Sequence, residues 1–240
     1  MSILNELMAD VAALFVPPRC PVCGEPLLMG ERAVCSFCRA TAPLTGFWRE
    51  ADNPVASKFW GLVPVYRASG FLYYLHGSGW RQLIHGFKYR GAWRTARAMG
   101  EWYGRCLAES GLYDDVDVVV PLPLHPLKRC RRGYNQSEYI AEGIAAQLGV
   151  EVDRRSVRRK RNTASQALKP RRERARNVED AFAVRHPDRL EGRHVLLVDD
   201  VMTTGSTLAA CASAILQAAP GCRVSVAALA VSRRELGVKA

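Results

Sequence analysis

One stretch of the sequence reads Val195-Leu196-Leu197-Val198-Asp199-Asp200-Val201-Met202-Thr203-Thr204-Gly205-Ser206-Thr207-Leu208. Its apolar start is typical of a buried parallel strand, and ligands of such sheets bind at the carboxyl ends of the strands. The acids Asp199 and Asp200 lie at that end, and a small, hydroxyl-rich turn then opens a helix. Consecutive N–H groups and the positive end of a helix both favour an anion. The stretch therefore predicts a phosphate and ribose site, although acids and threonines also serve merely as helix caps.

The second half of the chain alternates between apolar strands and helical segments. Expected strands and helices, in chain order, are a helix at 95–107, a strand at 116–120, a helix at 137–148, a strand at 195–198, a helix at 203–218 and a strand at 224–230. Such alternation predicts an α/β fold in which a parallel sheet is flanked by crossover helices.

The 240 residues fall into three regions of different composition. Residues 1–43 hold a short helix candidate and paired cysteines, residues 44–94 are rich in aromatic side chains, and residues 95–240 carry the α/β pattern. The aromatic side chains from Trp48 to Trp80 have two interpretations. They either stack on the bases of a ligand or pack within a core.

The charge of the chain indicates an anionic partner. The formal net charge is +11, which suits a polyphosphate, a nucleic acid or a lipid headgroup. No basic, apolar leader is visible at the start, and no segment approaches the roughly 18 uninterrupted apolar residues that would cross a bilayer. We therefore expect a cytoplasmic protein without membrane insertion.

The cysteines near the start form two CxxC pairs separated by eleven residues: Cys20, Cys23, Cys35 and Cys38. Four thiolates at this spacing can close a tetrahedral zinc site, and four protein ligands leave no open position for chemistry. The prediction is a structural Zn²⁺ site, with a redox pair or chance as the alternatives. A zinc knuckle on a basic protein either contacts nucleic acid or only fastens the terminus.

A second turn follows the strand at 116–120 and ends in a basic segment. The turn consists of Leu122, Pro123, Leu124 and His125, and Arg132 and Gly133 follow shortly after. A strand that leads into a proline-bounded turn and clustered arginines is suited to a polyanion. His125 is a general acid, a phosphate donor or a polar turn residue. Arg132 and the pair Asn135 and Gln136 either contact the ligand or orient the turn.

These motifs together resemble one family. Their order along the chain resembles that of the ComF family, the ComFC or GntX type of phosphoribosyltransferase-like protein. The motifs that carry the resemblance are the double CxxC, Phe87-Lys88-Tyr89-Arg90-Gly91, the Pro-x-Pro-x-His turn, Arg132-Gly133-Tyr134-Asn135-Gln136, Gln166, Arg174, Asn177 and the acidic pair. The acidic stretch resembles the diphosphoribosyl-binding motif of type I phosphoribosyltransferases. The resemblance covers about Cys20 to Leu229. The one departure is Leu168, which stands one residue early.

The resemblance implies a type I phosphoribosyltransferase fold with a small N-terminal zinc-binding segment. It implies that phosphoribosyl pyrophosphate binds with Mg²⁺, that Asp199 and Asp200 hold the ribose hydroxyls, and that the turn after the strand at 116–120 grips pyrophosphate. The 5′-phosphate would lie in the loop of Thr203, Thr204, Gly205, Ser206 and Thr207. It also implies a role in natural competence, in which single-stranded DNA is taken up during transformation alongside a competence helicase or other DNA-processing proteins.

A basic segment from Arg154 to Arg176 interrupts the α/β pattern, where we expect a long loop or ribbon. As a hypothesis, residues 158–177 close over the site and Arg171 or Arg174 meets pyrophosphate; the alternative is a solvated run of charges. Arg174, Asp199 and Asp200 would then serve catalysis. Two other functions stay open, a catalytically inactive nucleic-acid-binding or regulatory protein and a nucleobase phosphoribosyltransferase of nucleotide salvage, because no motif names an acceptor.

Overall fold

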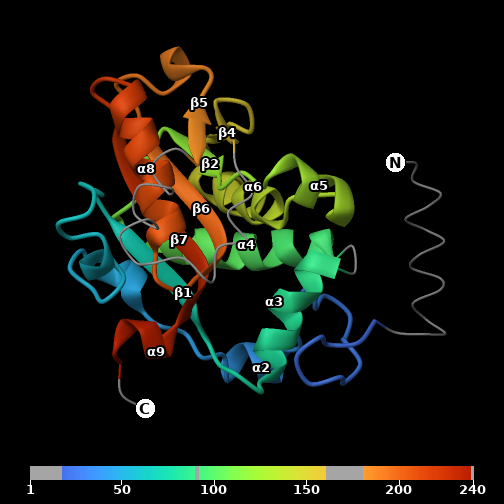
Figure 1. Ribbon diagram of the computed structural model, residues 1–240. Helices are drawn as coiled ribbons and strands as arrows, with labels where there is room; N and C mark the ends of the chain where they lie inside the picture. Colours follow the sequence, from blue (N-terminus) through green and yellow to red (C-terminus); the bar gives the residue numbers. More distant parts are fainter. Residues whose placement is uncertain (1–17, 90–91, 161–180, 239–240) are drawn as a thin grey trace.

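A five-stranded parallel sheet forms the centre of the computed structural model, which describes residues 18–89, 92–160 and 181–238 (Figure 1). The strand order is β1-β7-β6-β2-β3, and every pairing in this sheet is parallel. The strands are β1 (Ala68–Tyr74), β2 (Val118–Pro121), β3 (Glu151–Val152), β6 (His194–Met202) and β7 (Arg223–Ser232). The expected α/β class with a parallel sheet is confirmed.

Helices cover both faces of the sheet (Figure 1). The longer ones are α3 (Gly79–Tyr89), α4 (Trp93–Glu109), α6 (Gln136–Leu148) and α8 (Ser206–Ala218). The shorter ones are α2 (Ser36–Ala40), α5 (Pro126–Arg132), α9 (Arg233–Leu236) and the 3-10 helices η1 (Phe47–Arg49), η2 (Ala56–Lys58) and η4 (Pro187–Arg189). No helix among the described residues is both long and apolar enough to cross a membrane.

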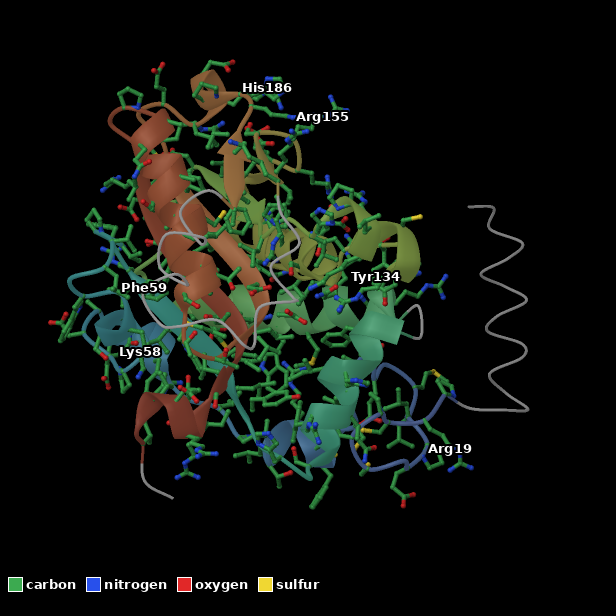
Figure 2. All side chains as sticks on the ribbon, viewed as in Figure 1. Arg19, Lys58, Phe59, Tyr134, Arg155 and His186 are labelled. Atoms are coloured by element: carbon green, nitrogen blue, oxygen red, sulfur yellow. The ribbon has the colours of Figure 1, made fainter. Side chains whose placement is uncertain are left out.

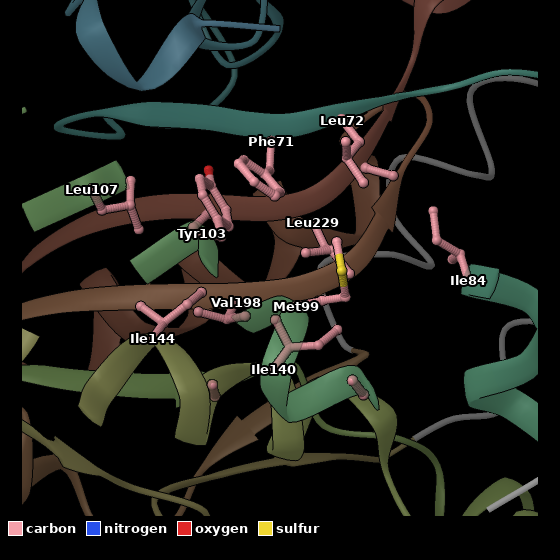
Figure 3. Packing of buried hydrophobic residues seen from close by; sticks show 14 of the residues in the cluster. Phe71, Leu72, Ile84, Met99, Tyr103, Leu107, Ile140, Ile144, Val198 and Leu229 are labelled. Carbon is pink, nitrogen blue, oxygen red and sulfur yellow. The ribbon is translucent and has the colours of Figure 1, made fainter. Parts of the chain in front are cut away.

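Alternate residues of β6 point into two separate cores. Val198 packs with Tyr103 of α4 and Ile140 of α6 (Figure 3). Leu196 belongs to the same core, whereas Leu197 belongs to the core on the other side, where α8 packs. Successive strand residues leave opposite faces of a sheet, so a continuous apolar run is what a strand covered on both sides requires. The apolar start of the quoted stretch is thus explained by burial on both faces.

Helices α4 and α6 touch at glycines. A β-carbon on Gly143 would lie 2.2 Å from the carbonyl oxygen of Arg97, and one on Gly100 would lie 2.3 Å from that of Ile140. Such distances are far below any van der Waals contact, so only glycine allows the two backbones to approach this closely. The close contact with α4 therefore fixes the position of α6, including its first residues.

The sheet differs from the sequence expectation at the acidic stretch. Strand β6 continues to Met202, so Asp199 and Asp200 lie within the strand rather than after it. Helix α8 begins at Ser206 and not at Thr203, because Gly205 adopts a left-handed conformation with φ of +79° that a helix cannot continue through.

The aromatic region contributes to the sheet itself. Strand β1 and helix α3 both lie within residues 44–94, and β1 pairs with β7. Trp48, Phe71 and Trp80 have exposed fractions of 3%, 0% and 6%. Packing therefore accounts for these three side chains, and stacking on a base does not. The division at residues 43 and 94 stays a prediction.

The described part of the basic segment includes a short strand, in keeping with the loop or ribbon expected at residues 154–176. Strand β4 (Val157–Arg159) pairs antiparallel with β5 (Phe182–Val184). Residues 161–180 lie outside the described residues, and with them Gln166, Arg171, Arg174 and Asn177.

Candidate functional site

The two acids lie where β6 outruns one of its neighbours. Strand β2 ends at Pro121, opposite Val198, while β7 continues beside Asp199 and beyond. The pair thus lies just beyond the end of β2, at the edge of the sheet where ligands of α/β folds bind, with Asp199 half-buried and Asp200 buried.

The start of α6 holds both carboxylates. The Ser137 hydroxyl donates to Asp199 Oδ1 over 3.1 Å, and the Asp200 backbone N–H donates to the same oxygen over 2.8 Å. The Gln136 side-chain amide donates to Asp200 Oδ2 over 3.2 Å. These bonds fix the orientation of two adjacent acids that would otherwise repel each other.

Burial and the neighbouring negative charge change the pKa of Asp199. Removal from solvent and the neighbouring Asp200 carboxylate raise the pKa of Asp199 well above its ordinary value, while the Asp200 N–H and the Ser137 hydroxyl oppose the shift. Arg159 of β4 is close enough for the Asp199 charge to support its cationic form, although burial lowers the pKa of Arg159 overall. Hydroxyl donors or a cation from a ligand would favour the ionised pair.

The predicted phosphate loop lies directly after the acids. Thr203, Thr204 and Ser206 are exposed, whereas Gly205 is buried and caps α8 in its left-handed conformation. The hydroxyls of Thr204 and Ser206 lie 3.0 Å apart. The loop thus opens to solvent at the N-terminus of a 13-residue helix, the arrangement that favours an anion.

A segment from the aromatic region lies against this loop. A β-carbon on Gly205 would lie 3.6 Å from Phe59 Cζ and 3.8 Å from Lys58 Cβ, and Figure 2 labels both residues beside the lower end of α8. Sequence reasoning did not find this neighbour, because nothing in residues 53–59 resembles a phosphate motif. The short segment is held by Asn53, whose side chain donates to Ala68 O over 2.8 Å and accepts from Val55 N over 2.9 Å.

The second predicted turn joins the same edge of the sheet. The Leu122 N–H donates to the Val198 carbonyl over 2.8 Å, which places the turn beside β6 just before the acids. Pro123, Leu124 and His125 are half-buried. His125 is the N-cap of α5, and its Nδ1 accepts from Leu127 N over 3.3 Å, which favours the interpretation as a polar turn residue.

Arg132 also lies in this group of residues. Its Nη1 atom is 3.4 Å from Gln136 Oε1, so one arginine, one amide and Asp200 form a chain of contacts. Sequence reasoning named Arg132 and Gln136, did not name Ser137, and included Arg159 only within residues 158–177. Ser137 was detectable as the next polar residue at the start of the helix, whereas Arg159 was indistinguishable within a run of basic residues.

The four cysteines of the N-terminal segment lie together. Their sulfur atoms are all within 4.8 Å of one another, and Cys23 Sγ is 3.6 Å from Cys35 Sγ. Sulfurs placed about 2.3 Å from a tetrahedral zinc ion are about 3.8 Å apart. The Cys35 N–H points to Cys20 Sγ over 3.4 Å. The cluster therefore fits a metal held by four thiolates.

The thiols differ in acidity. Burial alone would raise the pKa of Cys20, but the backbone N–H groups of Cys35, Cys23 and Val22 outweigh it and lower this pKa to about 7. Burial and the neighbouring thiols raise the pKa of Cys38 strongly. One thiolate is thus ready to bind a cation, and a bound metal would deprotonate the rest.

Comparison with known proteins finds a family match in the C-terminal part of the chain. The family model described as phosphoribosyl transferase domain matches residues 135–239. The chain is also similar to a solved structure, a glutamine phosphoribosylpyrophosphate amidotransferase from B. subtilis, with a TM-score of 0.42 and 18% identity over 60% of this chain and 30% of that one.

Three curated proteins are similar in sequence. DNA utilization protein YhgH of Escherichia coli K12 is 40% identical over 101 residues, which are 42% of this chain and 44% of that protein. Competence protein F of Haemophilus influenzae is 33% identical over 38% of this chain and 41% of its own length. Competence protein ComFC of Bacillus subtilis is 27% identical over 86% of this chain and 75% of its own length.

The first two matches span less than half the length of each relative, whereas the ComFC match extends over most of both chains. All three names agree with the resemblance found in the motifs. The chain is similar to the competence proteins ComFC and F and to YhgH, and its residues 135–239 match the phosphoribosyl transferase domain.

Proposed function

We propose that this chain binds phosphoribosyl pyrophosphate with Mg²⁺ at the carboxyl end of β6. The observation that carries the proposal is the acidic pair, held by Ser137 and Gln136 directly before the exposed loop that begins α8. Asp199 and Asp200 would accept from the ribose hydroxyls. The 5′-phosphate would lie on the loop of Thr203, Thr204, Gly205, Ser206 and Thr207, and pyrophosphate beside Leu122, Pro123, Leu124, His125 and Arg132.

The chemistry of such a site is chiefly positioning. Breaking the bond between ribose and pyrophosphate builds positive charge on the sugar, so fixed carboxylates nearby stabilise it. Mg²⁺, when bound with the ligand, would neutralise charge on the departing pyrophosphate. The protein would orient the ribose through the acids and hold the 5′-phosphate at the start of α8. An acceptor for the ribose is not part of this proposal.

Calorimetry with phosphoribosyl pyrophosphate and Mg²⁺ tests the proposal. The wild-type chain should bind the ligand, and the double variant Asp199→Ala/Asp200→Ala should not, because the ribose hydroxyls lose their acceptors. Asp188→Ala, which removes an exposed carboxylate of η4, is the matched control and should bind normally. A wild-type chain that shows no binding with Mg²⁺ would remove the basis of the proposal.

We further propose that the chain handles single-stranded DNA in natural transformation. Two observations favour this, the formal net charge of +11 and the printed names of its relatives, which refer to DNA utilization and competence. Contacts between arginines and phosphates release counterions, so the affinity should fall steeply between about 50 and 200 mM salt. Fluorescence anisotropy with a labelled oligonucleotide measures this slope. An affinity indifferent to salt contradicts the proposal, and Asp199→Ala should not weaken DNA binding.

For the cysteine cluster we propose a structural Zn²⁺ ion. The support is the geometry of Cys20, Cys23, Cys35 and Cys38, whose mutual distances suit a tetrahedral thiolate site. Four protein ligands would leave no position for a substrate. Reduced thiols require a reducing compartment, and the cytoplasm is the compartment we propose.

A further inference from the structure

Three consecutive polar residues are buried at the start of α6. Asn135, Gln136 and Ser137 have exposed fractions of 1%, 3% and 1%. Burying a polar side chain is unfavourable unless its hydrogen bonds are satisfied. In this helix start all three side chains make hydrogen bonds to parts of the proposed donor site, which sets them apart from ordinary helix-capping residues.

Asn135 ties the helix to the turn that follows β2. Its Oδ1 accepts from the Ser137 N–H over 3.2 Å, and its Nδ2 donates to the Leu122 carbonyl over 3.0 Å. Because both ends of the carboxamide are engaged, the side chain cannot rotate without losing a bond. The position of the turn and the position of the helix start are therefore linked.

Gln136 and Ser137 diverge to reach two different carboxylates. Successive helix residues point about 100° apart, so the two side chains leave α6 in different directions and each meets one acid of β6. Strand β2 stops opposite Val198, and the start of α6 meets both acids beyond that point. Gln136 is held at its other atom as well, since its Oε1 lies 3.4 Å from Arg132 Nη1.

We propose that Asn135, Gln136 and Ser137 are positioning residues of the donor site. Ser137 fixes the rotation of the Asp199 carboxylate, Gln136 fixes that of Asp200, and Asn135 sets the turn against them. A carboxylate whose rotation is already fixed loses little freedom when it accepts from a ribose hydroxyl, so the ligand binds more tightly. This inference rests on the proposed binding of phosphoribosyl pyrophosphate.

The test compares two sugar phosphates that differ in one hydroxyl. Calorimetry would measure ribose 5-phosphate and 2-deoxyribose 5-phosphate binding to the full chain, together with phosphoribosyl pyrophosphate and Mg²⁺. Ser137→Ala and Gln136→Leu should each lower the affinity for ribose 5-phosphate about tenfold, which is the effect of losing a hydrogen bond to a charged group. The affinity for 2-deoxyribose 5-phosphate should fall less, so the ratio of the two affinities, which measures the preference for ribose, becomes smaller. Ser137→Thr keeps the hydroxyl and should restore the preference.

Two variants serve as matched controls. Gln147→Leu changes an exposed residue at the other end of α6, and Ser213→Ala removes a hydroxyl of α8 that accepts only from Gln217 in the described bonds. Both should keep wild-type affinities for the two sugars. The melting temperature of every variant is measured in parallel, and if Gln136→Leu does not fold, Ser137→Ala and Ser137→Thr decide the matter.

The outcomes separate the inference from the function on which it rests. If the wild type binds and the Ser137→Ala and Gln136→Leu variants keep its affinities, the inference is overturned and the donor site stands. If the variants weaken both sugars equally while lowering the melting temperature, the residues are merely structural and the inference is again overturned. If the wild type fails to bind phosphoribosyl pyrophosphate with Mg²⁺, the donor site falls and the positioning role falls with it.

Discussion

At the scale of single residues, a charged cluster lies at the opposite end of β6 from the acidic pair. Asp115 accepts from Arg67 over 3.2 Å, and its carboxylate also lies 3.2 Å from Arg223 Nη1 and 3.1 Å from His194 Nδ1. His194 is fully buried, and its Nε2 lies 2.8 Å from the Ser225 hydroxyl. One carboxylate thus balances two arginines and orients a buried imidazole.

This cluster makes stability depend on pH. Burial, aided by Arg223, lowers the pKa of His194 below its ordinary value of 6.5, although Asp115 opposes the shift. The unfolded chain therefore takes up a proton before the folded chain does, and stability is lost as the pH falls below 6.5. Urea unfolding at a series of pH values should show this decline.

The variant His194→Gln should flatten the decline, because it removes the group that titrates. His186→Gln changes an exposed histidine and is the control that should keep the wild-type slope. A slope that survives in His194→Gln would show that another group is responsible. A separate loss is expected below pH 3.8, since the nearby cations lower the pKa of Asp115 against the opposing effect of burial.

Much of the proposed site was predictable residue by residue. Asp199 and Asp200 lie near the carboxyl end of an apolar strand and the loop follows that strand, and a strand end fixes where such residues meet. Ser137 was detectable as a polar residue at the start of a helix, but its hydrogen bond to Asp199 depends on how α6 packs against β6. The proximity of Arg159 to Asp199 depends on the pairing of β4 with β5. Sequence patterns describe local periodicity and carry no register.

At the scale of elements, the contact between α4 and α6 gives a sharp prediction. Gly143→Ala should lower the free energy of unfolding by about 1 to 3 kcal/mol or more, because its β-carbon meets backbone atoms that cannot move aside. Gly86→Ala in α3 is the matched control, since nothing lies within 4 Å of its β-carbon. That change should raise stability by about 0.5 to 1 kcal/mol. Equal effects of the two substitutions in urea unfolding would contradict this account.

Elements with strong periodicity were predictable, and short or irregular ones were not. The helices at α4 and α6 and the strands at β2, β6 and β7 agree with the expected segments to within a few residues. Strand β3 has two residues, too few for any pattern. Strand β1 reads Ala-Ser-Gly-Phe-Leu-Tyr-Tyr, and its mixed small and aromatic composition resembles the surrounding region.

At the scale of the whole molecule, the cysteine segment packs into the main core. Cys20, Cys35 and Cys38 are buried in the cluster that contains Phe71 and Tyr103. A β-carbon on Gly79, at the start of α3, would lie 1.9 Å from the Val22 carbonyl oxygen. Arg39 of α2 also lies 4.7 Å from the ring centroid of Trp102 in α4. The cysteine cluster is thus packed against the sheet domain and is not joined to it by a flexible linker alone.

Metal removal should therefore destabilise the whole chain. We expect one zinc ion per chain by elemental analysis, and a chelator should lower the melting temperature of the main transition, because metal binding is coupled to folding of the segment. Cys38→Ser should lose the metal and melt at a lower temperature. Cys130→Ser changes an exposed cysteine outside the cluster and should keep the bound metal and the wild-type melting temperature. A main transition unchanged by chelation would show that the segment folds independently.

Strand order has a consequence for how the chain is made. Among the described residues, β1 lies at the edge of the sheet and its neighbouring strand is β7, the last of the described strands. During synthesis the first strand to emerge therefore stays without its neighbour until nearly the entire polypeptide has been translated. Long separations between paired segments slow folding. A truncation that removes β7 would divide the sheet, leaving β1 with an exposed edge of the kind that seeds aggregation.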